Sequence, residues 1–204
     1  MKDFSIAMAI VDFIPVIFFG AAAVLLQRDL YNKMSQGVYA LFAAGTIDVV
    51  AAGALKAVYK VLYAAGVCDF IPLNAMFFPV QSIGFLLAGV GISAMLAKKR
   101  QKKTAALAVA PVVYNGTFLF VGLMVAGLGC MDAGLCYLAA KLKKKSAVGL
   151  FVLSFVCSLC MGYLSSQDFA QASMNWIAEG INVIGQGSLL GGVWMLHKAG
   201  LSEY

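Results

Sequence analysis

The chain is poor in charged residues and contains almost no histidine. Only 12% of its 204 residues are charged and one is a histidine, whereas 62% are hydrophobic. A soluble domain of this length carries more charged surface than that. One histidine excludes a haem held by two histidines, and no cluster of ligands has the spacing of a metal site. Phosphate-binding loops, serine triads and paired-carboxylate hydrolase motifs are also absent. We therefore expect no metal and no cofactor.

The chain is rich instead in long apolar runs. A bilayer core about 30 Å thick needs about 20 mostly apolar residues per helix, and helices satisfy their own backbone groups in lipid. We expect an all-α integral membrane protein with seven transmembrane helices, forming a single polytopic domain over residues 1–204. Five helices are expected at about residues 4–26, 38–65, 70–97, 146–165 and 174–197. Two more share residues 104–140, with a turn either near Gly122 or at residues 127–132.

Basic residues mark one side of the expected membrane domain. They gather in residues 28–33, 98–103 and 141–145, whereas the opposite connections carry Asp69 and Asp168. Positive charge is retained on the cytoplasmic side, so we expect an outer N-terminus, an inner C-terminus and cytoplasmic lysine-rich loops. The plasma membrane, in a bacterium the inner membrane, is the expected location. The net charge of +6 then reflects topology, and no basic face with interleaved aromatics indicates nucleic-acid binding.

The third and seventh expected helices resemble each other. A shift of 101 residues places Asn74 on Asn175 and Gln81 on Asn182, and it also aligns glycines, Gly84 with Gly185 and Gly91 with Gly192. The second expected helix maps on the sixth through residues 41–42 and 150–151. We expect a parallel internal repeat with a 3+1+3 plan, with halves at residues 4–97 and 123–197 and a linker helix at about 104–122. The layout, though no sequence motif, is similar to that of SWEET-type sugar transporters. Parallel repeats in transporters hold substrate near the membrane midplane.

Ionisable side chains within the expected spans are costly in lipid and mark functional sites. Asp12 and Asp48 lie near the middle of the first two spans, Glu179 lies in the outer half of the last, and Lys56 lies two turns from Asp48. We expect an outward-facing cavity lined by Asp12, Lys56 and Glu179, with Asp48 deeper. Asp48, Asp12 and Lys56 are the candidates for proton coupling. Lys60 is expected to reach the headgroups. The alternative is a static ion pair and a protonated aspartate that hold helices together.

Amide side chains in the spans can bind a neutral solute without a charge penalty. Gln81 and Asn182 fall at matching depths in the two halves, and Asn74 lies further toward the outer side. Together with Glu179, these three residues are the expected substrate-binding groups. The competing interpretation is hydrogen bonding between helices, which contributes about 0.6–2 kcal/mol in a bilayer.

These features lead to a functional hypothesis with two alternatives. The leading hypothesis is a transporter, namely a proton-coupled carrier for a small polar solute. Its expected partners are the lipid bilayer and the solute, and a homo-oligomer is compatible with the sequence. The first alternative is a membrane sensor or assembly protein whose polar interior is purely structural. The second, and the one enzyme considered, is a thiol/quinone oxidoreductase using Cys157 and Cys160, which their apolar neighbours disfavour. Cys68 and Cys130 are both expected at the outer surface, where a disulfide could form.

Overall fold

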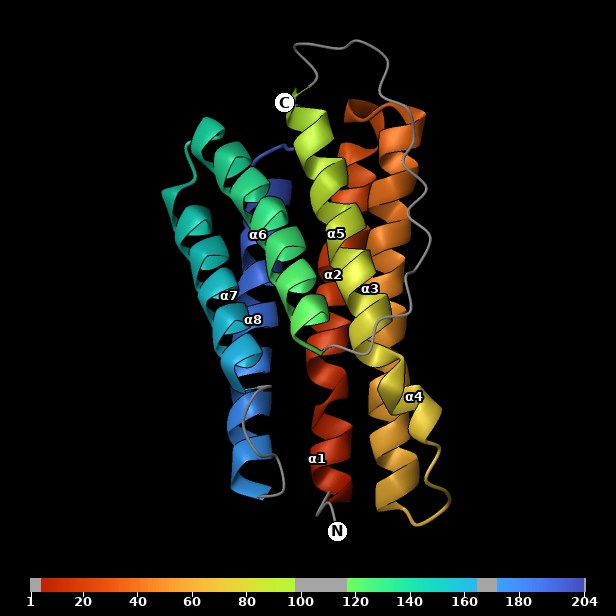
Figure 1. Ribbon diagram of the computed structural model, residues 1–204. Helices are drawn as coiled ribbons and strands as arrows, with labels where there is room; N and C mark the ends of the chain where they lie inside the picture. Colours follow the sequence, from red (N-terminus) through yellow and green to blue (C-terminus); the bar gives the residue numbers. More distant parts are fainter. Residues whose placement is uncertain (1–4, 98–116, 165–171, 204) are drawn as a thin grey trace.

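The computed structural model describes residues 5–97, 117–164 and 172–203 (Figure 1). Over these ranges the chain is helical and has no strand, so the predicted all-α class is confirmed. The elements are α1 Ile6–Val11, α2 Phe13–Leu30, η1 Tyr31–Lys33, α3 Gln36–Ala64, α4 Ile71–Ala75, α5 Phe77–Leu96, α6 Thr117–Lys141, α7 Lys145–Leu164 and α8 Ala172–Lys198.

Five helical stretches are long and apolar enough to cross a membrane. They are Ile6–Lys33, Gln36–Ala64, Ile71–Leu96, Leu119–Lys141 and Lys145–Leu164. α8, with 27 residues, is as long as these, but its sequence is interrupted by polar side chains that include Glu179 and Asn182. Five of the seven expected spans therefore correspond to helices of this kind, and α8 corresponds to a sixth in position only. Most of the other one, the linker helix expected at about residues 104–122, lies outside the described residues.

Two of the membrane-length stretches are broken, and a proline explains each break. A proline ring clashes with the carbonyl of the residue four positions earlier, which ends a regular helix there. Accordingly, α1 ends at Val11, four residues before Pro15, and α4 ends at Ala75, four residues before Pro79. The first break leaves Asp12 between α1 and α2, as the C-cap of one and the N-cap of the other. An acidic side chain is thus fixed at a discontinuity inside the bundle.

The long helices form a ring. Each contacts its neighbours in the order α2, α3, α5, α6, α7, α8 and back to α2. α5 and α6 run in the same direction. Ser82 Oγ donates a hydrogen bond to the Phe120 carbonyl 2.7 Å away, and about two turns further on in both helices Gly89 meets Gly127. The two termini lie at opposite ends (Figure 1).

The turn expected at Gly122 or at residues 127–132 is wrong at both places. α6 is continuous from Thr117 to Lys141 and passes through both. Gly127 serves packing instead, because a Cβ on it would overlap the backbone of Phe85 and Leu86 in α5. In membrane helices, small residues at a contact allow two backbones to approach closely. A glycine that resembled a turn signal in the sequence is therefore a helix–helix contact.

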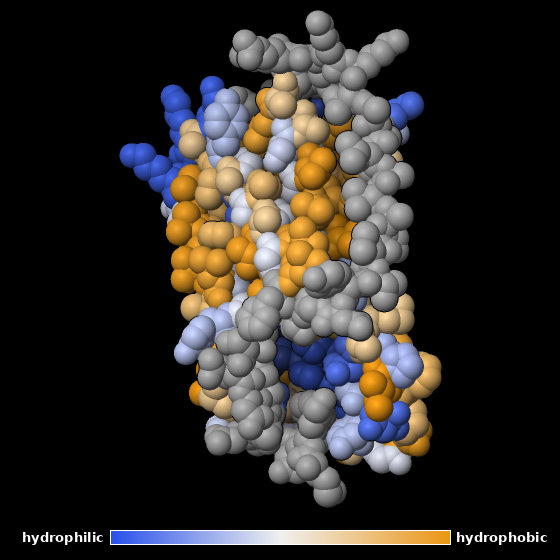
Figure 2. Space-filling view, in the orientation of Figure 1, coloured by the Kyte–Doolittle hydropathy of each residue, from blue (hydrophilic) through white to orange (hydrophobic). Residues whose placement is uncertain are grey.

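The two ends of the bundle differ in charge and in packing. One end, called here the lysine end, carries Arg28, Lys33, Lys141 and Lys198 at the ends of α2, η1, α6 and α8; the opposite end is called the cavity end. On the face seen in Figure 2, hydrophobic side chains form a band between the two ends. The half of the bundle next to the lysine end is filled by the main hydrophobic core, which includes Phe42, Ile92, Leu135, Phe151 and Val193.

Residues that the predicted repeat would make equivalent form similar contacts in this core. A Cβ on Gly91 of α5 would lie 2.8 Å from Cβ of Phe42 in α3. A Cβ on Gly192 of α8 would lie 2.6 Å from the ring of Phe151 in α7. The glycines are related by the predicted shift of 101 residues, and the phenylalanines are the pair predicted to match in the second and sixth spans. The contacts follow the register of the predicted repeat.

Candidate functional site

A cavity of about 280 Å³ lies in the half of the bundle next to the cavity end. Residues of α2, α3, α4, α5, α6, α7 and α8 line it. Hydrophilic side chains are visible in a recess below the hydrophobic band in Figure 2. Phe19, Phe85, Met124 and Leu128 belong both to the cavity wall and to the hydrophobic core. The cavity therefore ends about halfway through the bundle, where the core begins.

One wall of the cavity is aromatic. Phe77, Phe78 and Phe85 come from α5 and Phe19 comes from α2. The rings of Phe77 and Phe78 are 5.1 Å apart and those of Phe19 and Phe85 are 5.5 Å apart, both pairs in edge-to-face geometry. Such pairs are favoured by the ring quadrupoles. The four rings, called here the aromatic wall, are held in place by each other and by the core.

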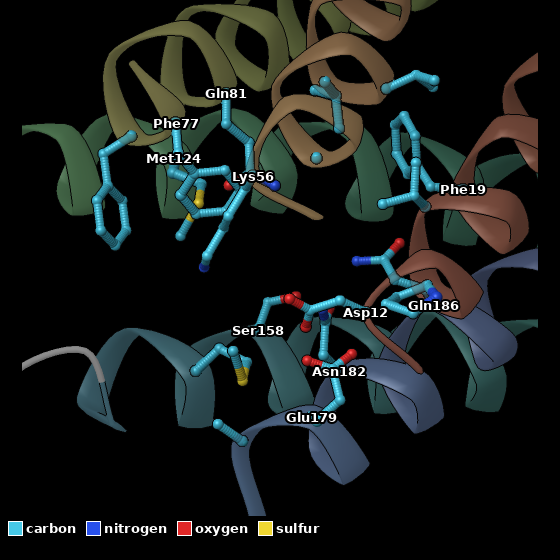
Figure 3. A pocket seen from close by; sticks show the side chains of 18 of the residues that line it. Asp12, Phe19, Lys56, Phe77, Gln81, Met124, Ser158, Glu179, Asn182 and Gln186 are labelled. Atoms are coloured by element: carbon cyan, nitrogen blue, oxygen red, sulfur yellow. The ribbon is translucent and has the colours of Figure 1, made fainter. Parts of the chain in front are cut away.

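The facing wall is polar. Glu179, Asn182 and Gln186 of α8 line the cavity together with Asp12, and they lie opposite Phe77 and Gln81 in Figure 3. The spacing of three, four and seven residues places the three α8 side chains on one helix face. Glu179 Oε1 and Gln186 Oε1 are buried and have no hydrogen-bond partner within the described ranges. The residues Asp12, Glu179, Asn182 and Gln186 are called here the polar wall.

A charged cluster occupies the part of the cavity near Asp12. Asp12 forms an ion pair with Lys60, and their side chains are only 9% and 11% exposed. The Glu179 carboxyl group lies within hydrogen-bonding reach of that of Asp12. Two carboxyl groups can hydrogen-bond to each other only if one of them carries a proton. The Lys56 ammonium group lies 3.8 Å from the centre of the Phe77 ring, in cation–π geometry.

The ion pair corrects one expectation. Lys60 was expected to reach the headgroups, whereas it is buried and pairs with Asp12. Lys56 and Lys60 are four residues apart, so both lie on the cavity-facing side of α3.

Six of the seven predicted site residues line the cavity. They are Asp12, Lys56, Asn74, Gln81, Glu179 and Asn182. Asp48 is not among the lining residues and is half-buried elsewhere on α3. Val49 and Gly53 face the cavity, and a step of one residue rotates a side chain by about 100° around the helix axis. Asp48 therefore has the expected depth but points away from the site.

The cavity also includes polar residues that were not predicted to belong to the site. Gln186, Asn175 and Lys60 line it, as does Ser158 of α7. The shift of 101 residues already pairs Asn175 with Asn74 and could have identified it. The repeat gave no such signal for Gln186, because its counterpart 101 positions earlier is Phe85, which is apolar.

Both predicted repeat halves contribute equivalent positions to the cavity. Five residues of α4 and α5 line it, and the residues 101 positions later in α8 line it too. The pairs are Asn74 with Asn175, Phe77 with Ala178, Phe78 with Glu179, Gln81 with Asn182, and Phe85 with Gln186.

A second polar pair joins α2 and α8 at the lysine end. His197 Nδ1 lies 2.9 and 3.0 Å from the two carboxylate oxygens of Asp29, whose side chain is 1% exposed. α2 and α8 are therefore held together by polar contacts on both sides of their interface, Asp12 with Glu179 near the cavity and Asp29 with His197 beyond the core. By contrast, α5 and α6 meet through the backbones of Gly89 and Gly127.

One carboxyl group is buried outside both clusters. Asp132 in the middle of α6 is 3% exposed, and neither of its oxygens has a hydrogen-bond partner in the described part of the chain. It was not among the predicted site residues, although it is far more buried than Asp48. An isolated carboxylate in such surroundings costs several kcal/mol, so we expect Asp132 to be protonated.

The cysteines lie apart from the cavity. Cys157 is buried where α7 meets Gly185 of α8, and Cys160 is exposed; neither lines the cavity. Cys130 lies in the middle of α6 beside Gly89, not at the outer surface where it was expected, and Cys68 follows α3 at the cavity end. Both are free thiols. Within the described ranges, no three His, Cys, Asp or Glu residues form a metal-binding group.

The comparisons with known proteins give no further information on this site, since no model of a protein family, no curated protein and no solved structure matches the chain.

Proposed function

We propose that this protein is a small multi-pass membrane carrier that moves a small polar solute across the membrane together with protons. The observation that supports this best is the cavity. It is lined by equivalent positions of both predicted halves and stops at a packed core halfway through the bundle. A carrier in one of its two open states has this arrangement, with the solute site near the midplane at the interface of the repeats.

The interfaces between the halves suggest how the opposite state is reached. α5 and α6 are in backbone contact at Gly89 and Gly127, which suits a pivot. α2 and α8 are joined by side-chain pairs, which can separate without unfolding either helix. Rocking about the glycine contact would separate α2 from α8 and part the core residues that close the lysine end. Such rocking of one repeat against the other around a fixed site is the usual form of alternating access.

The two carboxyl groups provide a means of coupling. Asp12 lies at the break before α2 and Glu179 lies on α8, so rocking changes their separation. While they touch, they share a proton, because two adjacent carboxylates cannot both be ionised at low cost. Once they separate beside Lys60 and Lys56, both can ionise and one proton leaves. Proton release would thereby be tied to the change of state.

The orientation follows from the basic residues at the lysine end. If these face the cytoplasm of a plasma membrane, the cavity faces the outside. The carrier would then take up its solute from the exterior and release it on the side of the lysine end.

Uptake into proteoliposomes tests this proposal. The full chain is reconstituted with a pH-sensitive dye inside, and a library of small polar solutes is added outside. We expect at least one solute to drive saturable proton entry, and Glu179→Gln to abolish proton entry while leaving solute exchange. Asp48→Asn is the matched control, because it neutralises a carboxyl group that does not line the cavity.

A negative outcome is equally informative. If no solute in the library drives flux, and Glu179→Gln differs from the wild type in thermal stability alone, the polar interior is structural and the protein is a sensor or assembly component. If Asp48→Asn abolishes proton entry and Glu179→Gln does not, the coupling group is Asp48, as its depth in the sequence predicted.

A further inference from the structure

The chemistry of the two facing walls identifies a class of solute. At three of the five equivalent pairs an aromatic residue of α5 faces the cavity where α8 has a different kind of side chain. The pairs are Phe77 with Ala178, Phe78 with Glu179, and Phe85 with Gln186. If the two predicted halves had kept the same side chains, the cavity would have two similar walls. One wall is instead aromatic and the other polar, which suits a solute with one flat apolar face and one hydrogen-bonding edge.

The aromatic wall is built for the flat face. Phe77, Phe78, Phe85 and Phe19 line one side of the cavity, and their edge-to-face contacts fix the ring positions. The Lys56 ammonium group already lies over the Phe77 ring, so the other three rings are the ones left for a flat solute. Planar π-systems stack on such side chains, and a stacked base contributes about 1–3 kcal/mol of binding energy when measured by alanine substitution. A solute with only hydroxyl groups, such as a sugar alcohol or a small polyol, would leave these rings against polar atoms.

The polar wall is built for the edge. Glu179 Oε1 and Gln186 Oε1 are buried acceptors without a partner in the described chain, and Figure 3 shows both residues directed to the cavity. Buried acceptors without a partner cost about 1–3 kcal/mol each, so a solute that donates to them recovers that cost. Asn182 lies between these two residues on the same helix face and can both donate and accept. The complementary edge carries N–H groups next to an acceptor.

Charge and size narrow the class. The cavity wall contains two acidic groups, Asp12 and Glu179, and two basic groups, Lys56 and Lys60, so its charges balance once both carboxyl groups are ionised. An ionic solute would bring an uncompensated charge into that state of the site. The volume of about 280 Å³ is at the lower end of the roughly 300–1,000 Å³ of ligand pockets, which suits one or two rings.

We propose that the cavity binds a small, uncharged, planar heteroaromatic compound, such as a free nucleobase or a pyridine carboxamide. Its ring lies against the aromatic wall, and its N–H edge donates to Glu179 and Gln186. This identification of the solute class deepens the proposed carrier function and depends on it for its transport role, although binding can be measured without transport.

The test uses the full chain in detergent and direct binding by isothermal calorimetry. The probes are adenine, uracil and nicotinamide, and the non-aromatic controls are myo-inositol and cyclohexanecarboxamide. We expect saturable binding of at least one planar probe and at least tenfold weaker binding of both controls. Phe78→Leu, which keeps an apolar side chain but removes the ring, should lower the affinity for that probe about tenfold. Gln186→Leu, which removes the buried acceptor that has no partner in the described chain, should lower the affinity for that probe by a similar factor.

A matched variant separates loss of the site from loss of the fold. Phe70→Leu removes an exposed ring that is not part of the cavity wall, and it should leave affinity within about twofold. Equal binding of planar and non-planar compounds, or a Phe78→Leu variant that melts like the wild type and binds the probe with wild-type affinity, would overturn the solute class.

Transport assays then distinguish this inference from the proposed function. If a non-aromatic solute is transported and the planar probes neither bind nor compete, the solute class is wrong and the carrier function stands. If a planar probe binds saturably with the expected response to Phe78→Leu, but no solute crosses the membrane, the solute class stands and the carrier function is wrong.

Discussion

The ion pair between Asp12 and Lys60 should be the most sensitive point in the cavity. Both side chains are about nine-tenths buried, so neither is screened by much water. Removing one partner of a buried pair costs about 3–5 kcal/mol, because the other charge is left uncompensated. Asp12→Asn should reduce the free energy of unfolding by an amount near the lower end of this range, since Glu179 can give up its proton and take over as partner of Lys60.

A double-mutant cycle measures this interaction. Unfolding of the wild type, Asp12→Asn, Lys60→Met and the double variant is followed by tryptophan fluorescence in mixed micelles as the denaturing detergent is increased. The double variant should recover most of the loss, because it buries no unpaired charge. Lys144→Met, at an exposed lysine of the lysine end, should change stability by less than about 0.5 kcal/mol. Single-variant losses that simply add, within about 0.5 kcal/mol, would refute a direct buried pair.

Three further predictions concern other parts of the bundle. Gly127→Ala should destabilise the protein by about 1–3 kcal/mol or more, because the new Cβ overlaps the α5 backbone, whereas Gly122→Ala, with nothing within 4 Å, should be neutral or stabilising; thermal unfolding in detergent compares the two. Asp132→Asn should change the melting temperature little, and stability should vary with pH between about pH 5 and 8 in the same way as in the wild type, because the native group is expected to be protonated there. A large loss of stability on this substitution would mean that Asp132 is ionised. His197→Ala leaves Asp29 without its partner across the α2–α8 interface, and it should speed the labelling of a cavity cysteine from the lysine end; unchanged labelling rates would mean that this pair does not hold the end closed.

The sequence predicted the composition and approximate depth of the site better than its geometry. Asp12, Gln81 and Glu179 were identified because polar side chains are costly in lipid, and that cost depends on depth alone. Asp48 satisfies the same criterion and yet does not line the cavity, because the face of a helix depends on its rotation within the bundle. Nothing in an almost uniformly apolar helix reveals that rotation. The expectation that Lys60 reaches the headgroups was wrong for a related reason, since its position on α3 turns it toward Asp12.

Glycine was the other source of error. Gly127 and its neighbours suggested a turn, as they would in a soluble protein. In a bundle of apolar helices, small residues are needed wherever two backbones come close, so the same residue type indicates a contact. The partner that decides between these two roles is Gly89, which lies 38 residues away in the chain. Contacts over such separations follow from the three-dimensional arrangement and not from local sequence.

The central claim is that one site opens alternately to the two sides of the membrane. It is tested most directly by labelling Gln81→Cys, in a background with the five native cysteines replaced, with a membrane-impermeant maleimide applied to sealed vesicles of either orientation. We predict labelling from the cavity end and, at a slower rate, from the lysine end, with both rates reduced by a solute that the protein binds. Labelling from the cavity end alone, under every pH gradient and with every solute that binds, would contradict alternating access and leave a closed pocket of the kind expected in a sensor.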